Sequence, residues 1–88
     1  MAKIIKANGD TQEVEPKNGT DFSLKEVQKI IGGYMQLVAT TDGKIMATDE
    51  EGKLKQKPKN KEATKLYQYG EHDPIVGDVL ICEHGQIT

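Results

Sequence analysis

Short apolar and β-branched runs separated by turn residues make up the first part of the chain. Two such runs, 3–7 and 11–15, flank the tripeptide Asn8-Gly9-Asp10. Asn-Gly between two strand-like runs is a strong signal for a tight hairpin turn, because both residues tolerate positive φ angles. The chain is therefore predicted to open with a β-hairpin.

The clearest helical signal begins at Ser23. Ser23 and Glu26 have the S-x-x-E spacing of a capping box, in which each side chain bonds a free backbone N–H at the start of a helix. Apolar residues then recur on one face, at Leu24, Val27, Ile30 and Ile31. Gly32-Gly33 supplies a residue for the left-handed conformation that ends many helices. These features predict an amphipathic helix over 24–31 that packs on a sheet.

Two further strand-like runs, 34–40 and 44–48, surround the turn dipeptide Asp42-Gly43 and predict a second hairpin. Residues 53–57 are predicted to be a short extended edge segment that ends at Pro58. The hairpin and this segment add three extended stretches to the first two.

Asn60 is a good helix cap, and a short second helix is expected to follow it and to stop near Gly70. The apolar run 75–82, interrupted by Gly77-Asp78, is predicted to be the last strand. We therefore expect residues 1–88 to form one α+β domain with the order hairpin, helix, hairpin, short helix, strand. A β-grasp domain would use this order, and other α+β arrangements fit it too.

Composition limits the core and the kinds of site that it can hold. The chain has 88 residues, of which 35% are hydrophobic and 5% aromatic, and it has no Trp. A single core built mainly from aliphatic side chains follows, and a large apolar ligand cavity is not expected on this supply.

The charge pattern bears on nucleic-acid binding. The formal net charge is −2, and all twelve basic residues are Lys. Without Arg the chain lacks the planar, bidentate group that reads guanine edges and phosphates most specifically. Base-specific recognition of DNA is therefore disfavoured.

The location of the protein is inferred from what the sequence lacks. Cys82 is the single cysteine and cannot form an internal disulfide, which favours a reducing compartment. The apolar run at the N-terminus is too short for a signal peptide, and no stretch approaches the ~20 apolar residues of a membrane span. We expect a cytoplasmic protein with no membrane contact.

The most unusual local feature is a lysine at every second position from 53 to 61. With Lys65 and one opposing acid, Glu62, the segment 53–65 has six lysines and one glutamate and so carries a formal +5. In an extended segment, alternate side chains share one face and would stand about 6.6 Å apart. Such a row would suit a polyanion.

An anion is also expected at the predicted helix start. Lys59 and Lys61 flank the cap, where the helix dipole already disfavours cations, so a bound anion would relieve the conflict. The predicted anion-binding residues are Lys53, Lys55, Lys57, Lys59, Asn60 and Lys61. The alternative is that these lysines only protect an exposed strand edge from aggregation.

The sequence contains no motif typical of a metal site or of a catalytic site. Glu71-His72-Asp73 and Cys82-Glu83-His84 lack the spacing of a zinc site, and the acids between 42 and 51 do not match a calcium loop. Cys82 falls in a strand predicted to be buried, where a thiol is usually inert. We expect no metal, no cofactor, no catalytic residue and no enzymatic activity.

Four fragments of the chain keep a distinctive order and spacing. They are Gly32-Gly33-Tyr34, DEEGKLK at 49–55, P-x-N-x-x-A-T at 58–64 and IVGDVL at 75–80. Over about residues 30–82, with the first hairpin and helix in register, they resemble a family of small proteins known as a domain of unknown function. The family is found in bacteria, phages and conjugative elements, so the resemblance implies a mobile-element setting and no particular activity.

These observations favour a non-catalytic binding protein of a phage or mobile element. Its partner would be a host protein or a small phosphate-bearing ligand. The alternative is a weak, sequence-independent nucleic-acid binder that uses the lysines of segment 53–65. A small hydrolase with unassigned carboxylates is a third hypothesis, and the sequence does not specify an oligomeric state.

Overall fold

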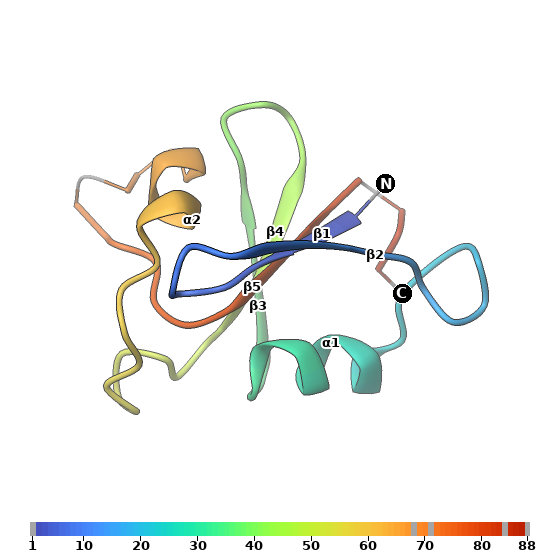
Figure 1. Ribbon diagram of the computed structural model, residues 1–88, viewed down its shortest axis with the longest axis horizontal. Helices are drawn as coiled ribbons and strands as arrows, with labels where there is room; N and C mark the ends of the chain where they lie inside the picture. Colours follow the sequence, from blue (N-terminus) through green and yellow to red (C-terminus); the bar gives the residue numbers. More distant parts are fainter. Residues whose placement is uncertain (1, 68, 71, 84, 88) are drawn as a thin grey trace.

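Five strands and two helices form in the computed structural model, which describes residues 2–67, 69–70, 72–83 and 85–87 (Figure 1). The elements are β1 (Ala2–Ile5), β2 (Thr11–Val14), α1 (Leu24–Ile31), β3 (Met35–Ala39), β4 (Ile45–Asp49), α2 (Lys61–Leu66) and β5 (Val79–Cys82). This order confirms the predicted α+β domain of two hairpins, a helix, a short helix and a final strand.

The strands form one sheet in the order β2-β1-β5-β4-β3, and every neighbouring pair is antiparallel. Figure 1 looks along this sheet, with β2 in front and β3 fainter behind it. The last strand thus lies between the two hairpins and joins them. β2 and β3 are the two edge strands.

The centre of the sheet differs from that of a β-grasp domain, whose first and last strands run parallel. Here β1 and β5 are adjacent but antiparallel, with Ile5 opposite Val79. Next to this pair, Asp78 Oδ1 accepts a hydrogen bond from the N–H of Ala7 at 3.0 Å. The bond holds the start of β5 beside the end of β1.

The predicted start and end of α1 are confirmed. Ser23 Oγ accepts a hydrogen bond from the Glu26 N–H at 3.2 Å, and Glu26 Oε1 accepts one from the Ser23 N–H at 3.0 Å. The backbone bonds to Ser23 and Lys17 lower the pKa of Glu26. Gly32 ends the helix at φ 77°, a left-handed conformation that suits glycine.

The core has two parts, one on each face of the sheet. The part under α1 consists of Ala2, Phe22, Val27, Ile31, Ala47, Leu80 and Cys82. The part on the opposite face consists of Ile5, Met46, Ala63, Ile75, Val79 and Ile81. All four residues of β5 are buried, because this central strand is covered on both faces. That position explains why its sequence is a continuous apolar run.

The prediction of an extended segment over 53–57 is wrong. The backbone there forms successive turns, with the Lys55 N–H donating to Glu51 O at 3.0 Å and the Lys57 N–H donating to Gly52 O at 3.1 Å. Gln56 has a φ of 58°, which an extended strand does not allow. The lysines of this segment therefore do not form one straight row.

The boundaries of the last two elements also differ from the prediction. α2 ends at Leu66 because Tyr67 adopts an extended conformation and bridges to Thr40 in an antiparallel arrangement. The last strand begins at Val79, while Val76 bridges to Lys59 instead. The segment before β5 thus holds α2 against the sheet.

Candidate functional site

The turns after β4 bring two lysines of the predicted anion site onto one buried carboxylate. Asp49, at the end of β4, has a fully buried side chain. Its Oδ2 lies 2.6 Å from Lys57 Nζ and 2.9 Å from Lys55 Nζ. Its Oδ1 accepts a hydrogen bond from the Glu51 N–H at 2.9 Å. Asp49 therefore neutralises part of the positive charge that the sequence predicts for a bound anion.

The same two lysines also hold the end of α1. Lys57 Nζ donates to Ile31 O at 2.7 Å, and Lys55 Nζ donates to Gly32 O at 3.2 Å. The last carbonyls of a helix lack partners within the helix and favour cations. We call the group formed by Asp49, Lys55 and Lys57 the Asp49 cluster. It joins α1, β4 and the turns that follow β4.

Gly33 makes room for the Asp49 cluster. A Cβ atom at this position would lie 2.5 Å from the Asp49 carboxylate. Such a distance is well inside the van der Waals contact of two heavy atoms, so any larger residue would displace the carboxylate. The second glycine after α1 thus serves packing, and the first ends the helix.

The pKa of Asp49 reflects two opposed effects. Burial by itself would raise this pKa, because it penalises the charged form. Hydrogen bonds from Lys57, Lys55 and the Glu51 N–H favour the charged form more strongly and lower the pKa to about 2. The carboxylate is therefore ionised at neutral pH and matched by its two lysines.

The side chain of Asn60, another residue of the predicted anion site, is already hydrogen-bonded within the protein. The residue is fully buried, and its Oδ1 accepts the Ala63 N–H at 3.0 Å as the cap of α2. Its Nδ2 donates to Ile5 O and to Gly77 O, both at 2.9 Å. The side-chain amide therefore links α2, β1 and the turn before β5.

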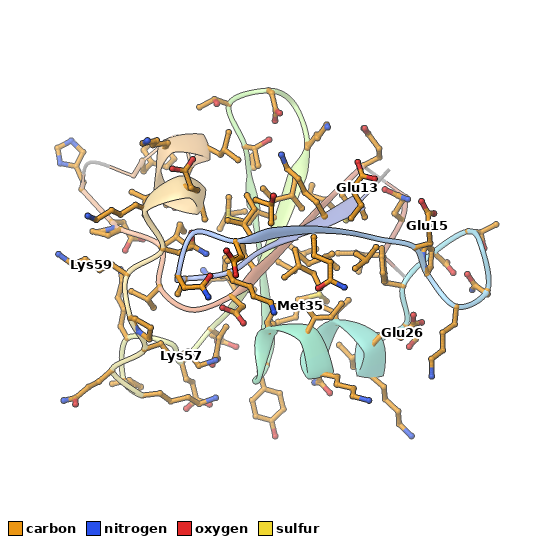
Figure 2. All side chains as sticks on the ribbon, in the orientation of Figure 1. Glu13, Glu15, Glu26, Met35, Lys57 and Lys59 are labelled. Atoms are coloured by element: carbon orange, nitrogen blue, oxygen red, sulfur yellow. The ribbon has the colours of Figure 1, made fainter. Side chains whose placement is uncertain are left out.

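The remaining lysines of the predicted site point to solvent. Lys53 pairs with Asp73, whereas no ion pair joins Lys59 or Lys61 to another of the described residues. Figure 2 shows Lys59 at the outer margin beside α2, with Lys57 closer to α1. The structure thus brings Lys55 and Lys57 together on Asp49 and leaves Lys59 and Lys61 exposed. Anion binding by this segment stays a prediction.

A groove lies between the edge strand β2 and α1, and the sequence did not predict it. Its apolar lining comes from Ile4, Val14, Phe22 and Ile30, and its volume is about 460 Å³. Its charged lining comes from Glu15, Lys17, Lys25, Glu26 and Lys29. We call this the β2–α1 groove.

The backbone edge beside this groove is open. In the first hairpin the Lys6 N–H donates to Asp10 O at 2.8 Å. Because hydrogen-bonded and non-hydrogen-bonded pairs alternate in an antiparallel ladder, the N–H and C=O groups of Thr11 and Glu13 then point away from β1. Figure 2 shows the Glu13 side chain on the side of β2 away from α1. The groove therefore borders a strand edge that can accept another strand.

Only part of the carboxylate lining of the groove is available to a ligand. Glu26 already accepts hydrogen bonds from the Ser23 N–H and, at 3.1 Å, from the Lys17 N–H. The side chains of Lys17, Lys25 and Lys29 are in no ion pair with another described residue. The charge that the groove offers is therefore mainly positive.

The other candidate metal-capable or nucleophilic side chains lie in the segments 71–73 and 82–84. Glu71 and His84 lie outside the described residues, and the described part of the chain holds no group of three His, Cys, Asp or Glu side chains suited to a metal. Cys82 is fully buried, and burial, followed by the nearby Glu83 charge, raises its pKa to about 11. No helix in the described ranges is long and apolar enough to cross a membrane.

Comparison with known proteins identifies a matching family. Residues 2–88 match the family described as a domain of unknown function, DUF3846. No curated protein and no solved structure matches the chain. The match extends over nearly the whole chain and includes the hairpin and helix that precede the four fragments. The chain therefore belongs to the DUF3846 family of domains of unknown function.

Proposed function

We propose that the chain is a non-catalytic binding protein of a phage or mobile element, and that it engages a host protein in the cytoplasm. The observation that carries the proposal is the β2–α1 groove, whose apolar floor borders an open strand edge. The mobile-element setting comes from the family resemblance. Binding of an extended peptide segment is the role that best suits this geometry.

The groove and the strand edge would act together. An added strand would bond to the outward backbone groups of Thr11 and Glu13, and these main-chain bonds supply affinity for any sequence. Alternate side chains of the added strand would point to the α1 side and meet Val14 and Ile30. The exposed lysines of the groove favour acidic residues next to those apolar side chains.

The states of the thiol and of two hydrogen-bonded carboxylates also support a binding role over a catalytic one. A nucleophilic thiol must be accessible and easily ionised, whereas Cys82 is buried with a raised pKa. The two carboxylates with the most hydrogen bonds, Asp49 and Glu26, serve the end and the start of α1. Their bonds stabilise the charged form, which is the opposite of what a general acid at neutral pH requires.

A proline at position 13 tests strand addition at this edge. Peptides selected from a random display library on the wild-type protein should bind Glu13→Pro about tenfold more weakly, because proline removes the outward N–H and its ring blocks the edge. The control Glu13→Ala keeps the N–H and should bind as wild type does. Affinities can be measured by fluorescence anisotropy. Selection of no reproducible peptide, or equal binding to Glu13→Pro and Glu13→Ala, would contradict the proposal.

The second candidate function is sequence-independent binding of nucleic acid or of a phosphate-bearing ligand. One observation favours it: Lys59 and Lys61 are exposed and unpaired among the described residues. With so few contacts, affinity for a single-stranded oligonucleotide should be weak and should fall only gradually as salt rises, because the salt dependence scales with the number of phosphates contacted.

Calorimetric titration of the oligonucleotide and of ATP at low and physiological salt examines this candidate. Replacing both lysines, in Lys59→Ala/Lys61→Ala, should abolish binding, whereas the control Lys3→Ala/Lys6→Ala should not. Binding that is absent at low salt, or unchanged in the first double variant, would remove the candidate. A preference for ATP over the oligonucleotide would indicate a specific phosphate ligand.

A further inference from the structure

The second edge strand, β3, lacks the features that usually protect a sheet edge. Residues 34–41 read Tyr-Met-Gln-Leu-Val-Ala-Thr-Thr, without a charge or a proline, in a chain that is 30% charged. Natural edge strands are usually guarded by charged residues, prolines or bulges. The other edge follows this rule, since β2 contains Glu13 and is followed by Glu15, Pro16 and Lys17. The unguarded edge is therefore β3.

Large apolar side chains are exposed at this edge. Tyr34 is 65% exposed and Leu37 is 47% exposed. Leu37 pairs with Ala47, which belongs to the core under α1, so Leu37 points to the α1 side of the sheet. Met35 shares that side, because alternate residues of a strand face the same way. The edge thus offers apolar contact together with backbone groups.

The hydrogen bonds of the second hairpin show which backbone groups are open. The Thr40 N–H donates to Lys44 O at 3.0 Å, so the alternation of the ladder directs the N–H and C=O of Met35 and Leu37 away from β4. At the far end of the strand, the Thr41 N–H donates to Leu66 O at 2.8 Å. The free part of the edge is therefore the stretch 34–38, before α2 covers the strand.

We infer that this edge pairs with the same edge of a second copy of the chain, which gives a two-fold symmetric dimer with one continuous sheet. An axis through Gln36 places Met35 opposite Leu37 of the second copy, and Leu37 opposite its Met35. Each of these two pairs exchanges both backbone hydrogen bonds. The two Met and two Leu side chains then meet on the α1 side, and the two Gln36 amides meet on the other face.

The choice of a second copy rests on self-complementarity. The stretch 34–38 carries no charge, so pairing with itself sets no like charges opposite each other. The same operation at β2, with its axis through Gln12, would place Glu13 opposite Thr11 of the second copy and leave the two Glu13 carboxylates as diagonal neighbours on one face, which is unfavourable. A two-fold contact also closes on itself, whereas joining β3 to β2 would propagate into a fibre. In Figure 1 the two edges lie at the front and the back, so the dimer leaves the β2–α1 groove open.

Sedimentation analysis of the full chain from micromolar to near-millimolar concentration tests the dimer. The wild type should show twice the mass of the chain, and Leu37→Lys should show the mass of one chain, because two ammonium groups would face the apolar contact. The control Thr11→Lys introduces the same charge at an outward-facing residue of the other edge strand, β2, and this variant should remain a dimer. A wild type that stays monomeric throughout, a dimer that survives Leu37→Lys, or open-ended assembly would overturn the inference.

Hydrogen exchange supplies a second measurement that needs no variant. In the dimer, the amide hydrogens of Met35 and Leu37 should be protected at high concentration and should exchange faster on dilution. Amides of Thr11 and Glu13, on the open edge, should exchange at the same rate at both concentrations. Equal exchange at Met35 and Leu37 across the dilution would contradict pairing through β3, even if the protein dimerises by another surface.

Discussion

Asp49→Asn is expected to lower the free energy of unfolding by about 2 to 4 kcal/mol. Removing one member of a buried ion pair leaves the other charge without compensation, which typically costs about 3 to 5 kcal/mol. We expect a smaller loss than this typical cost because solvent screens the lysine charges: the side chain of Lys55 is 41% exposed and that of Lys57 is 21% exposed. Urea denaturation followed by circular dichroism measures the change. Glu50→Gln, at the exposed neighbouring carboxylate, is the matched control and should leave the midpoint unchanged.

The pH dependence of this difference gives an independent check. The pKa of Asp49 is about 2 in the folded protein, below its usual value of 3.8, so the folded state binds the proton more weakly than the unfolded state does. The stabilisation by Asp49 is therefore fully present above about pH 4 and is lost as the pH falls towards about 2. The gap between wild type and Asp49→Asn should close over that interval. A gap that stays constant down to pH 2 would show that the carboxylate charge is not what stabilises the cluster.

The elements defined by local interactions were the ones that the sequence predicted well. The two capping bonds join Ser23 and Glu26 to each other, three residues apart, so their spacing is enough to place the start of α1. The turn at Asn8-Gly9-Asp10 is equally local, and the first hairpin forms around it. Where a structural signal is contained in a short stretch of chain, sequence alone identifies it.

The role of the lysines could not be predicted in the same way. Their regular spacing indicated a strand, but the partners of Lys57 are Asp49 and a carbonyl 26 residues away at the end of α1. Only the folded chain brings these groups together. In the sequence, the end of the helix explains both glycines of the Gly32-Gly33 pair. In the structure only Gly32 has the left-handed conformation that ends α1, whereas Gly33 makes room for the Asp49 carboxylate.

The two proposed interaction surfaces differ in how far they could be recognised from the sequence. The β2–α1 groove depends on the approach of β2 to α1, which no local pattern reports. The uncharged stretch 34–41 was readable in the sequence, but its meaning depended on β3 being at an edge of the sheet. In a central strand the same residues would only have filled the core.

Asn60→Ala is expected to lower the free energy of unfolding by about 3 to 5 kcal/mol. The change removes three hydrogen bonds and leaves the Ala63 N–H, Ile5 O and Gly77 O without their partner in a buried site. Each buried polar group left unpaired costs about 1 to 3 kcal/mol. A loss of this size is a large share of the stability of a small domain. The control Asn18→Ala, in an exposed loop with only local hydrogen bonds, should change the stability much less.

Asn60→Asp separates the two roles of this side chain. An aspartate can still accept the Ala63 N–H as a helix cap, but it has no N–H to donate and would face the carbonyls of Ile5 and Gly77 with a negative charge. If Asn60 acts mainly as the link between α2, β1 and the turn before β5, Asn60→Asp should be at least as destabilised as Asn60→Ala at neutral pH. Recovery of wild-type stability in Asn60→Asp, measured by urea denaturation, would show that the cap alone matters. Either result concerns folding, because this amide is buried and already bonded to the protein itself.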